Sequence, residues 1–169
     1  MNETQLFAFE QDFVDSLRCI PMAVRLKLDV CGIKVSLRQW SRFTREDRWD
    51  LLMAGCETPG EIMQYRAVLT DLIAQRAQEA AQPLTEPPCR QWEDADRLPP
   101  VVAGFAMALG LSPPTSPQWA ALTRLQRFAL LKLTRDNHDN VNFAPAMREF
   151  GLTDSQAPRR RAHTAAYAG

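Results

Sequence analysis

The chain has 169 residues, enough for one ordinary domain or two very small ones. Apolar residues make up 46% and charged residues 24%, close to the usual composition of globular proteins, which argues against disorder and membrane insertion. Twenty basic and twenty acidic residues give a formal net charge of zero, so the chain offers no overall field that would attract nucleic acid. The N-terminus, MNETQLFAFEQDF, lacks the basic and apolar segments of a secretory signal, and we expect a cytoplasmic protein.

The first half of the chain predicts helices with clear start and stop signals. After a short helix over FEQDFVDSL, a second helix is expected over about 21–31, begun by Pro21 and stopped by Gly32. SLRQW follows as a brief turn. Thr44 then caps a helix over TREDRWDLLMAG, with Asp47 three residues on to complete a capping box.

The clearest helix signal is TPGEIMQYRAVLTDLIAQRA. Thr58 is its cap, Pro59 takes the first helical position, and Glu61 stands three residues after the cap. Its apolar side chains share one face: Ile62, Tyr65, Leu69, Leu72 and Ile73. The next stretch, AQPLTEPPCRQW over 81–92, carries three prolines without a helical period, so we expect a linker or surface loop.

The second half repeats this kind of pattern. A helix over LPPVVAGFAMALGL stops at Gly110, and SPQWAAL forms a short capped turn. Thr123 opens a helix over TRLQRFALLKL, and a last helix over FAPAMREF ends at Gly151. Because no segment alternates like a half-buried strand, the predicted fold class is all-α.

The two halves align as a pseudo-repeat. Alignment of Trp40 with Trp119 also matches Gln39 with Gln118, Thr44 with Thr123, Arg48 with Arg127, and Trp49 with Phe128. Such a repeat is first of all a packing unit, because one copy cannot cover its own apolar faces. We therefore expect a single domain over 1–152, built from halves 7–80 and 93–152 and followed by a flexible basic tail over 153–169.

The repeated tryptophans and arginines invite a structural and a functional interpretation. Trp40 and Trp119 are expected to be buried anchors that fix the angle between the QW turn and the capped helix. Arg48 and Arg127 each precede an aromatic residue that we expect in the core. Each arginine would either pair with a carboxylate of the other half or lie exposed at a partner surface.

The pieces SLRCIP, CGIK, LQRFAL and HDNVNF occur in an order and spacing that resemble the nitrate reductase associated protein family of photosynthetic bacteria. The resemblance covers about residues 7–152. It implies a small cytoplasmic accessory protein that supports production of active molybdenum-dependent assimilatory nitrate reductase. Its partner would be the reductase or the proteins that assemble its cofactor, and the family supplies no catalytic residues to carry over.

The sequence also lacks the motifs of the common enzyme classes. The chain has no glycine-rich phosphate loop, no HExxH and no GxSxG, and its two histidines are His138 and His163. We therefore expect neither catalysis nor a resident cofactor.

The cysteines leave an alternative open. Cys19, Cys31 and Cys56 could hold an iron–sulfur cluster or another metal, or carry the molybdenum cofactor. A helix between the first two would separate them by about 16 Å at 1.5 Å per residue, whereas a thiolate lies about 2.3 Å from a bound zinc ion. Free thiols, mostly buried, are the preferred interpretation, and this includes Cys89.

The polar stretch TRDNHDNVNF, residues 134–143, has no counterpart in the first half and is the favoured place for partner recognition. Asn and Asp also favour caps and turns, which explains part of its composition. The predicted partner-binding residues are Arg135, His138, Asn140 and Asn142, together with Arg48 and Arg127. A helical nucleic-acid binder is a further alternative, against which the zero net charge and the acidic segment REDRWDLL both argue.

Overall fold

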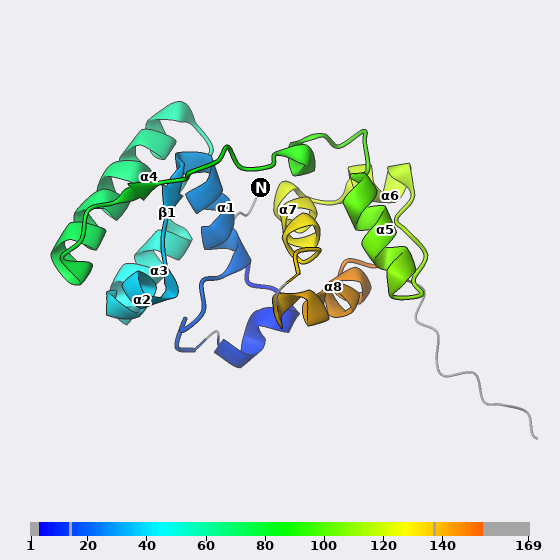
Figure 1. Ribbon diagram of the computed structural model, residues 1–169, viewed down its shortest axis with the longest axis horizontal. Helices are drawn as coiled ribbons and strands as arrows, with labels where there is room; N and C mark the ends of the chain where they lie inside the picture. Colours follow the sequence, from blue (N-terminus) through cyan, green and yellow to red (C-terminus); the bar gives the residue numbers. More distant parts are fainter. Residues whose placement is uncertain (1–3, 14, 137, 154–169) are drawn as a thin grey trace, which may run out of the picture.

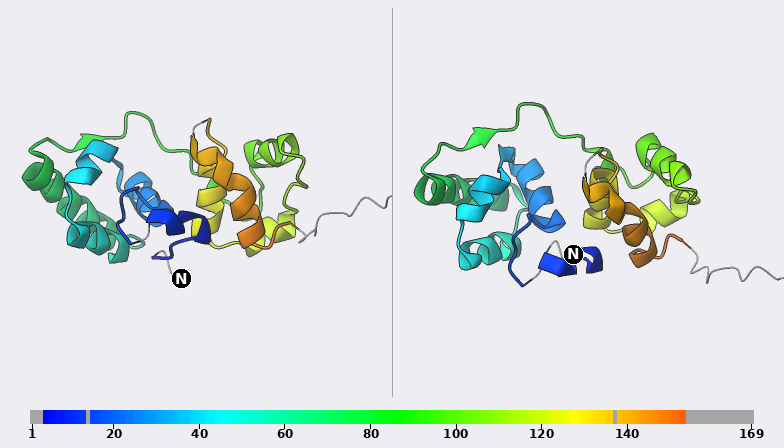
Figure 2. Two further views of the ribbon diagram at one scale, coloured as in Figure 1. Left: turned by 90° about the horizontal axis from the view of Figure 1, so that it is seen from below. Right: turned by 60° about the horizontal axis from the view of Figure 1, so that its bottom comes forward.

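The computed structural model describes residues 4–13, 15–136 and 138–153. Its helices form two groups that meet where α1 and α7 lie against each other (Figures 1 and 2). The first group contains α1 (Met22–Cys31), α2 (Leu37–Arg42), α3 (Arg45–Met53), α4 (Pro59–Leu72) and the π-helical η2 (Ile73–Ala77). The segment η1 (Ala8–Phe13) precedes this group in the chain but packs against the last helix of the second group. The second contains η3 (Gln91–Glu93), α5 (Pro100–Ala108), α6 (Ser116–Ala121), α7 (Arg124–Lys132), η4 (His138–Asn142) and α8 (Phe143–Glu149).

The predicted helical fold class is confirmed, with a small addition. Two strands of two residues each, β1 (Ile33–Lys34) and β2 (Gln82–Pro83), pair antiparallel beside α1. None of the described helices is long and apolar enough to cross a membrane. The predicted basic tail lies outside the described residues from 154 onward.

The predicted helix starts and stops are observed. Thr44, Thr58 and Thr123 each accept a hydrogen bond from the backbone N–H three residues on, and each is part of a complete capping box. Gly32 and Gly110 have φ angles of 74° and 72°, the left-handed conformation that glycine adopts without steric cost.

Helix α1 receives its N-terminal cap from another element. Pro21 at the cap position offers no side-chain hydrogen bond. Glu10 of η1 replaces it, accepting hydrogen bonds from the backbone N–H of Met22 at 2.7 Å and of Phe7 at 3.0 Å. Burial raises the pKa of Glu10 above its ordinary value, although these two hydrogen bonds oppose that change.

The buried side chains form one continuous apolar cluster, which includes Trp40, Trp92 and Trp119. Trp92 corrects an expectation, because the stretch 81–92 is more than a linker. It contributes strand β2 and, at its end, an indole that is fully buried against Phe128. A proline-rich composition indicates that a stretch is not helical, but it does not exclude that one side chain of the stretch, here Trp92, is buried in the core.

Two further expectations are corrected at the edges of the fold. The first helix is only the 3₁₀ segment η1, and it ends before Leu17, which has a φ of 47°. The Trp49 side chain, expected in the core, is 47% exposed. The reason is that α3 packs mainly against α1 and α4, whereas α7 is enclosed by α1, η3, α5 and α8.

Candidate functional site

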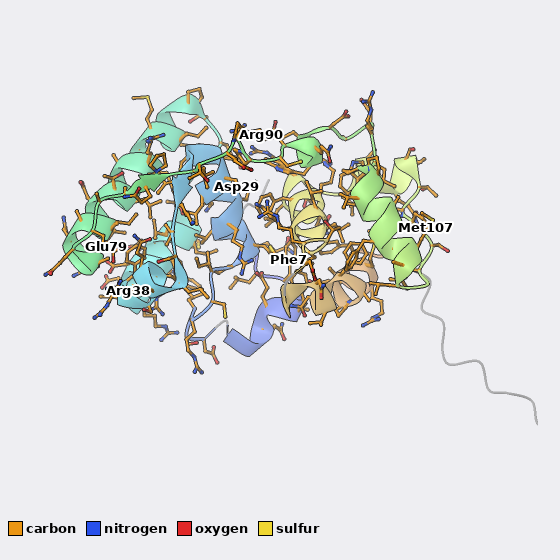
Figure 3. All side chains as sticks on the ribbon, viewed as in Figure 1. Phe7, Asp29, Arg38, Glu79, Arg90 and Met107 are labelled. Carbon is orange, nitrogen blue, oxygen red and sulfur yellow. The ribbon has the colours of Figure 1, made fainter. Side chains whose placement is uncertain are left out.

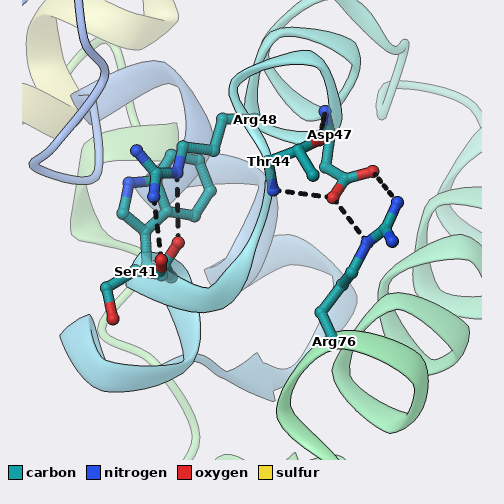
Figure 4. A network of polar contacts seen from close by, with 6 residues as sticks. Ser41, Thr44, Asp47, Arg48 and Arg76 are labelled. Atoms are coloured by element: carbon teal, nitrogen blue, oxygen red, sulfur yellow. Dashed lines mark hydrogen bonds and ion pairs between the residues drawn. The ribbon is translucent and has the colours of Figure 1, made fainter.

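The junction between α2 and α3 is built around the indole of Trp40, which is 1% exposed. Its Nε1–H donates to the carbonyl of Leu17 at 2.7 Å. The Arg48 guanidinium lies 5.8 Å from the centre of the indole and donates to the carbonyls of Trp40 at 3.1 Å and Ser41 at 3.2 Å (Figure 4). A third bond, to Ser16 at 3.1 Å, ties the junction to the segment before α1. Arg48 thus satisfies carbonyls at the end of α2 that the helix leaves unpaired.

The junction between α6 and α7 uses the same residue types. Trp119 Nε1–H donates to the carbonyl of Asp94 at 2.9 Å. Arg127 donates to the carbonyls of Trp92 at 2.9 Å and Leu122 at 2.6 Å, and burial lowers the pKa of Arg127. The predicted burial of both tryptophans is confirmed. The expectation that either arginine pairs with a carboxylate of the other half is wrong, since helix-end and loop carbonyls accept their hydrogen bonds instead.

Asp47 joins the start of α3 to the end of the α4 region. Its carboxylate accepts from the backbone N–H of Thr44 at 2.8 Å and from two nitrogens of Arg76 at 2.9 and 3.1 Å (Figure 4). Partial burial alone would raise the pKa of Asp47, but the bonds from Arg76 and Thr44 outweigh it, and the pKa is lowered. The ion pair fixes the distance between the two helical segments that flank it.

A groove with a volume of about 500 Å³ lies between α3 and α4. It is lined by Asp47, Asp50, Leu51, Ala54, Gly55, Glu61, Gln64, Tyr65, Val68 and Leu72. Its apolar side chains come from both helices, and every charged side chain among the lining residues is acidic. The volume falls within the range of pockets that hold small ligands or anchoring side chains.

A buried lysine behind Tyr65 fixes the floor of this groove. Lys27 is 1% exposed and donates through Nζ to the carbonyls of Leu52 at 2.6 Å and Ala54 at 2.7 Å. The Tyr65 hydroxyl donates to the carbonyl of Leu51 at 3.1 Å. Positive charge at the end of a helix is favourable because the last carbonyls and the helix dipole are negative. This contact could not be inferred from the sequence, since a single Lys on an apolar helix is usually solvated.

The same two helices expose large apolar side chains to solvent. On α3 these are Trp49 at 47% and Met53 at 51%, one turn apart, and on α4 they are Met63 at 73% and Val68 at 45%. Of the four, only Val68 is among the residues that line the groove, whereas Trp49, Met53 and Met63 lie on other sides of their helices. We call Val68 and the groove together the α3–α4 face. A groove that carries an exposed apolar side chain is a candidate surface for contact with another protein. Sequence analysis missed this face, although Val68 was an apolar residue off the predicted buried face of its helix.

The structure places the predicted partner-binding residues apart from one another. Arg135 is exposed and lines a second cavity, beside α1. Asn140 and Asn142 are half-buried, and the His138 side chain lies outside what the structure describes. Arg48 is half-buried and Arg127 is only 9% exposed, so Arg127 offers little surface to a partner. Recognition by the 135–142 loop stays a prediction.

The cysteines do not form the cluster that the metal-carrier alternative requires. Cys31 and Cys56 are buried, whereas Cys19 and Cys89 are exposed, and all four are free thiols. In the described part of the chain no three His, Cys, Asp or Glu residues are arranged to hold a metal ion. Burial raises the pKa of the Cys31 thiol, which disfavours the thiolate that a metal would need.

Fold and surface together define a small, mostly helical protein with one continuous core and a preformed acidic groove. Residues 6–150 match the family model of the conserved nitrate reductase-associated protein. The chain therefore belongs to this family, and the resemblance drawn from SLRCIP, CGIK, LQRFAL and HDNVNF is confirmed. No curated protein and no solved structure matches the chain.

Proposed function

We propose that the chain is a non-catalytic accessory protein that binds molybdenum-dependent assimilatory nitrate reductase and supports its activity or maturation in the cytoplasm. The family description, which names an association with nitrate reductase, supports the choice of partner. The observation that carries the mode of action is the α3–α4 face, where the exposed side chain of Val68 lies in a groove whose charged lining residues are all acidic.

The chemistry of the groove indicates what it would bind. Val68 and Leu72 offer apolar contact above the buried Leu51 and Tyr65. Asp50 and Glu61 place carboxylates at its border. An amphipathic segment of the reductase with an apolar anchor and flanking Lys or Arg residues would complement both properties. The apolar anchor would supply most of the affinity, and the basic residues would orient the segment and speed its association.

Exposed valines on two helices provide a matched test of this surface. Val68 on α4 is 45% exposed and lines the groove, whereas Val101 on α5 is 46% exposed and lies in the other group of helices. Val68→Arg should weaken binding to purified nitrate reductase by about tenfold or more, because it puts a long charged side chain into the groove. Val101→Arg should bind like the wild type, and circular dichroism melting would show that both variants are folded.

Three outcomes would each reject a different part of the proposal: the partner, the contact surface or the supporting role. Absence of binding by the wild-type chain would reject nitrate reductase as the direct partner. Weakening by Val101→Arg alone would move the contact to α5, which also exposes Met107. Tight binding without any change in reductase activity or in the yield of active reductase would reject the supporting role.

A further inference from the structure

A second cavity, of about 320 Å³, lies where α1 and β1 meet α7. We call it the seam cavity, because its lining comes from both groups of helices. It is lined by Cys19, Ile20, Arg25, Leu28, Asp29, Ile33, Lys34, Val35, Leu37, Leu84, Lys132 and Arg135. This set includes Arg135, the residue at the start of the polar stretch that sequence analysis singled out for recognition.

The charged side chains around the seam cavity are mostly cationic. Arg25 and Lys34 come from the first group of helices, and Lys132 and Arg135 come from α7 and the turn after it. The only acidic residue among those lining the cavity is Asp29 on α1 (Figure 3), whose carboxylate lies 2.6 Å from Lys132 Nζ. Arg25 also interacts with Glu10 outside the cavity lining. The other three cations, Lys34, Lys132 and Arg135, still outnumber the one carboxylate among the lining residues.

These cations are held at different depths. The Asp29–Lys132 pair is largely buried, with side chains 12% and 14% exposed. The Nε–H of Arg25 donates to the carbonyl of Ile20 at 2.9 Å, which fixes the guanidinium beside the cavity. Lys34 and Arg135 are exposed at its border. A bound anion would therefore meet these two exposed cations first, with the largely buried Asp29–Lys132 pair deeper in the cavity.

The rest of the lining is apolar. Val35 and Leu84 are half-buried and Leu37 is 57% exposed, whereas Leu28 and Ile33 belong to the buried core. A bare inorganic anion would leave Val35, Leu37 and Leu84 partly exposed to solvent. An aromatic or aliphatic body of modest size would cover them, and the cavity volume lies at the lower end of the range for small-molecule sites.

We propose that the seam cavity binds a small phosphate monoester, an apolar or aromatic body that carries one terminal phosphate. A phosphate monoester carries close to two negative charges at neutral pH and offers three acceptor oxygens, which suits several convergent Arg and Lys donors. The ligand would contact both groups of helices at once. This site is separate from the α3–α4 face and does not depend on the proposed binding of nitrate reductase.

Phenyl phosphate is the probe that tests both parts of the proposed ligand, the aromatic body and the terminal phosphate. Isothermal titration of the full chain should show phenyl phosphate binding about tenfold or more tighter than either phenol or inorganic phosphate. Equal affinity for phenyl phosphate and inorganic phosphate would overturn the role of the apolar wall. Equal affinity for phenyl phosphate and phenol would overturn the role of the cations.

The two exposed cysteine thiols can report where on the protein phenyl phosphate binds. Cys19 lines the seam cavity, whereas Cys89 is exposed and is not among its lining residues. Saturating phenyl phosphate should slow alkylation of Cys19 by iodoacetamide, measured by peptide mass spectrometry, and should leave Cys89 unchanged. Equal rates at Cys19 with and without phenyl phosphate would place any binding elsewhere and reject the site.

Charge reversal at the cavity border supplies the matched variants. Lys34→Glu and Arg135→Glu should each weaken phenyl phosphate binding by about tenfold, because each replaces an attraction by a repulsion. Arg45→Glu, at an exposed position at the start of α3, makes the same change in net charge away from the cavity and should bind like the wild type. If Arg45→Glu weakens binding as much as the cavity variants, the effect is one of overall charge and the proposal fails.

Discussion

Helices α3 and α7 begin alike but occupy different positions in the molecule. Each follows a short helix that contains a buried Trp, each starts at a Thr capping box, and each carries an Arg that bonds carbonyls of the preceding helix end. Helix α7 buries six of its nine residues, whereas α3 buries two. The shared junction sets how each helix starts, and the surrounding elements decide how much of it is covered.

The residue after each Arg shows this difference most clearly. Phe128 on α7 is fully buried against Trp92, while Trp49 at the matching place on α3 is 47% exposed. The segment whose carbonyl accepts from Arg127 contributes the indole of Trp92, which covers α7. The segment whose carbonyl accepts from Arg48 contributes Leu17 at the corresponding place. The lack of a covering element on α3 is what leaves Trp49 exposed to solvent.

The largest expected effects come from the anchors of the two junctions. Trp40→Ala and Trp119→Ala should each lower the free energy of unfolding by about 3 to 5 kcal/mol, because each empties a large buried volume. Urea denaturation followed by circular dichroism would measure both. A loss below about 1 kcal/mol at either site would mean that the junction collapses around the missing indole.

The arginines should separate the two junctions. Arg127→Leu leaves the carbonyls of Trp92 and Leu122 buried without their donors, and we expect a loss of about 3 kcal/mol. Arg48→Leu should cost about 1 kcal/mol, because Arg48 is half-buried and water can replace it. The same denaturation series applies, and equal losses would contradict the difference in burial drawn between α3 and α7.

The smallest expected effect is a difference in acid sensitivity. The capping-box partner is Asp47 in α3 and the neutral Gln126 in α7. Because the pKa of Asp47 is lowered from 3.8 in the folded protein, its contribution is present above that value and is lost as the pH falls through the folded pKa. Asp47→Asn should therefore cost about 1 kcal/mol at neutral pH and progressively less below pH 3.8.

Thermal melting of the wild type and Asp47→Asn across this pH range would measure the difference. Gln126→Asn serves as the control in α7, where the difference from the wild type should not change with pH, since neither side chain titrates. A pH-independent difference for Asp47→Asn would show that the carboxylate charge contributes nothing at the α3 junction.

Helix starts and stops were predictable because their signals are local. Thr44, Thr58 and Thr123 each bond a residue three positions away, so the sequence alone contains both partners. Gly32 and Gly110 depend only on their own backbone conformation. The overall helical class followed from the same short-range patterns.

The candidate site was not predictable, because it depends on contacts between distant residues. Lys27 reaches the end of α3, and Trp92 enters the core from a proline-rich stretch. Glu10 caps a helix that begins twelve residues later. None of these contacts leaves a periodic trace in the sequence, and the groove between α3 and α4 exists only once both helices are placed.

The Lys27 contact also bears on how fast a partner could bind. If α3 moved away from α1, the buried ammonium of Lys27 would lose the hydrogen bonds to these two carbonyls, so such motion is costly. The groove is then already in its binding shape before any encounter. We expect its association rate to follow diffusion and salt concentration, without a slow conformational step of this chain.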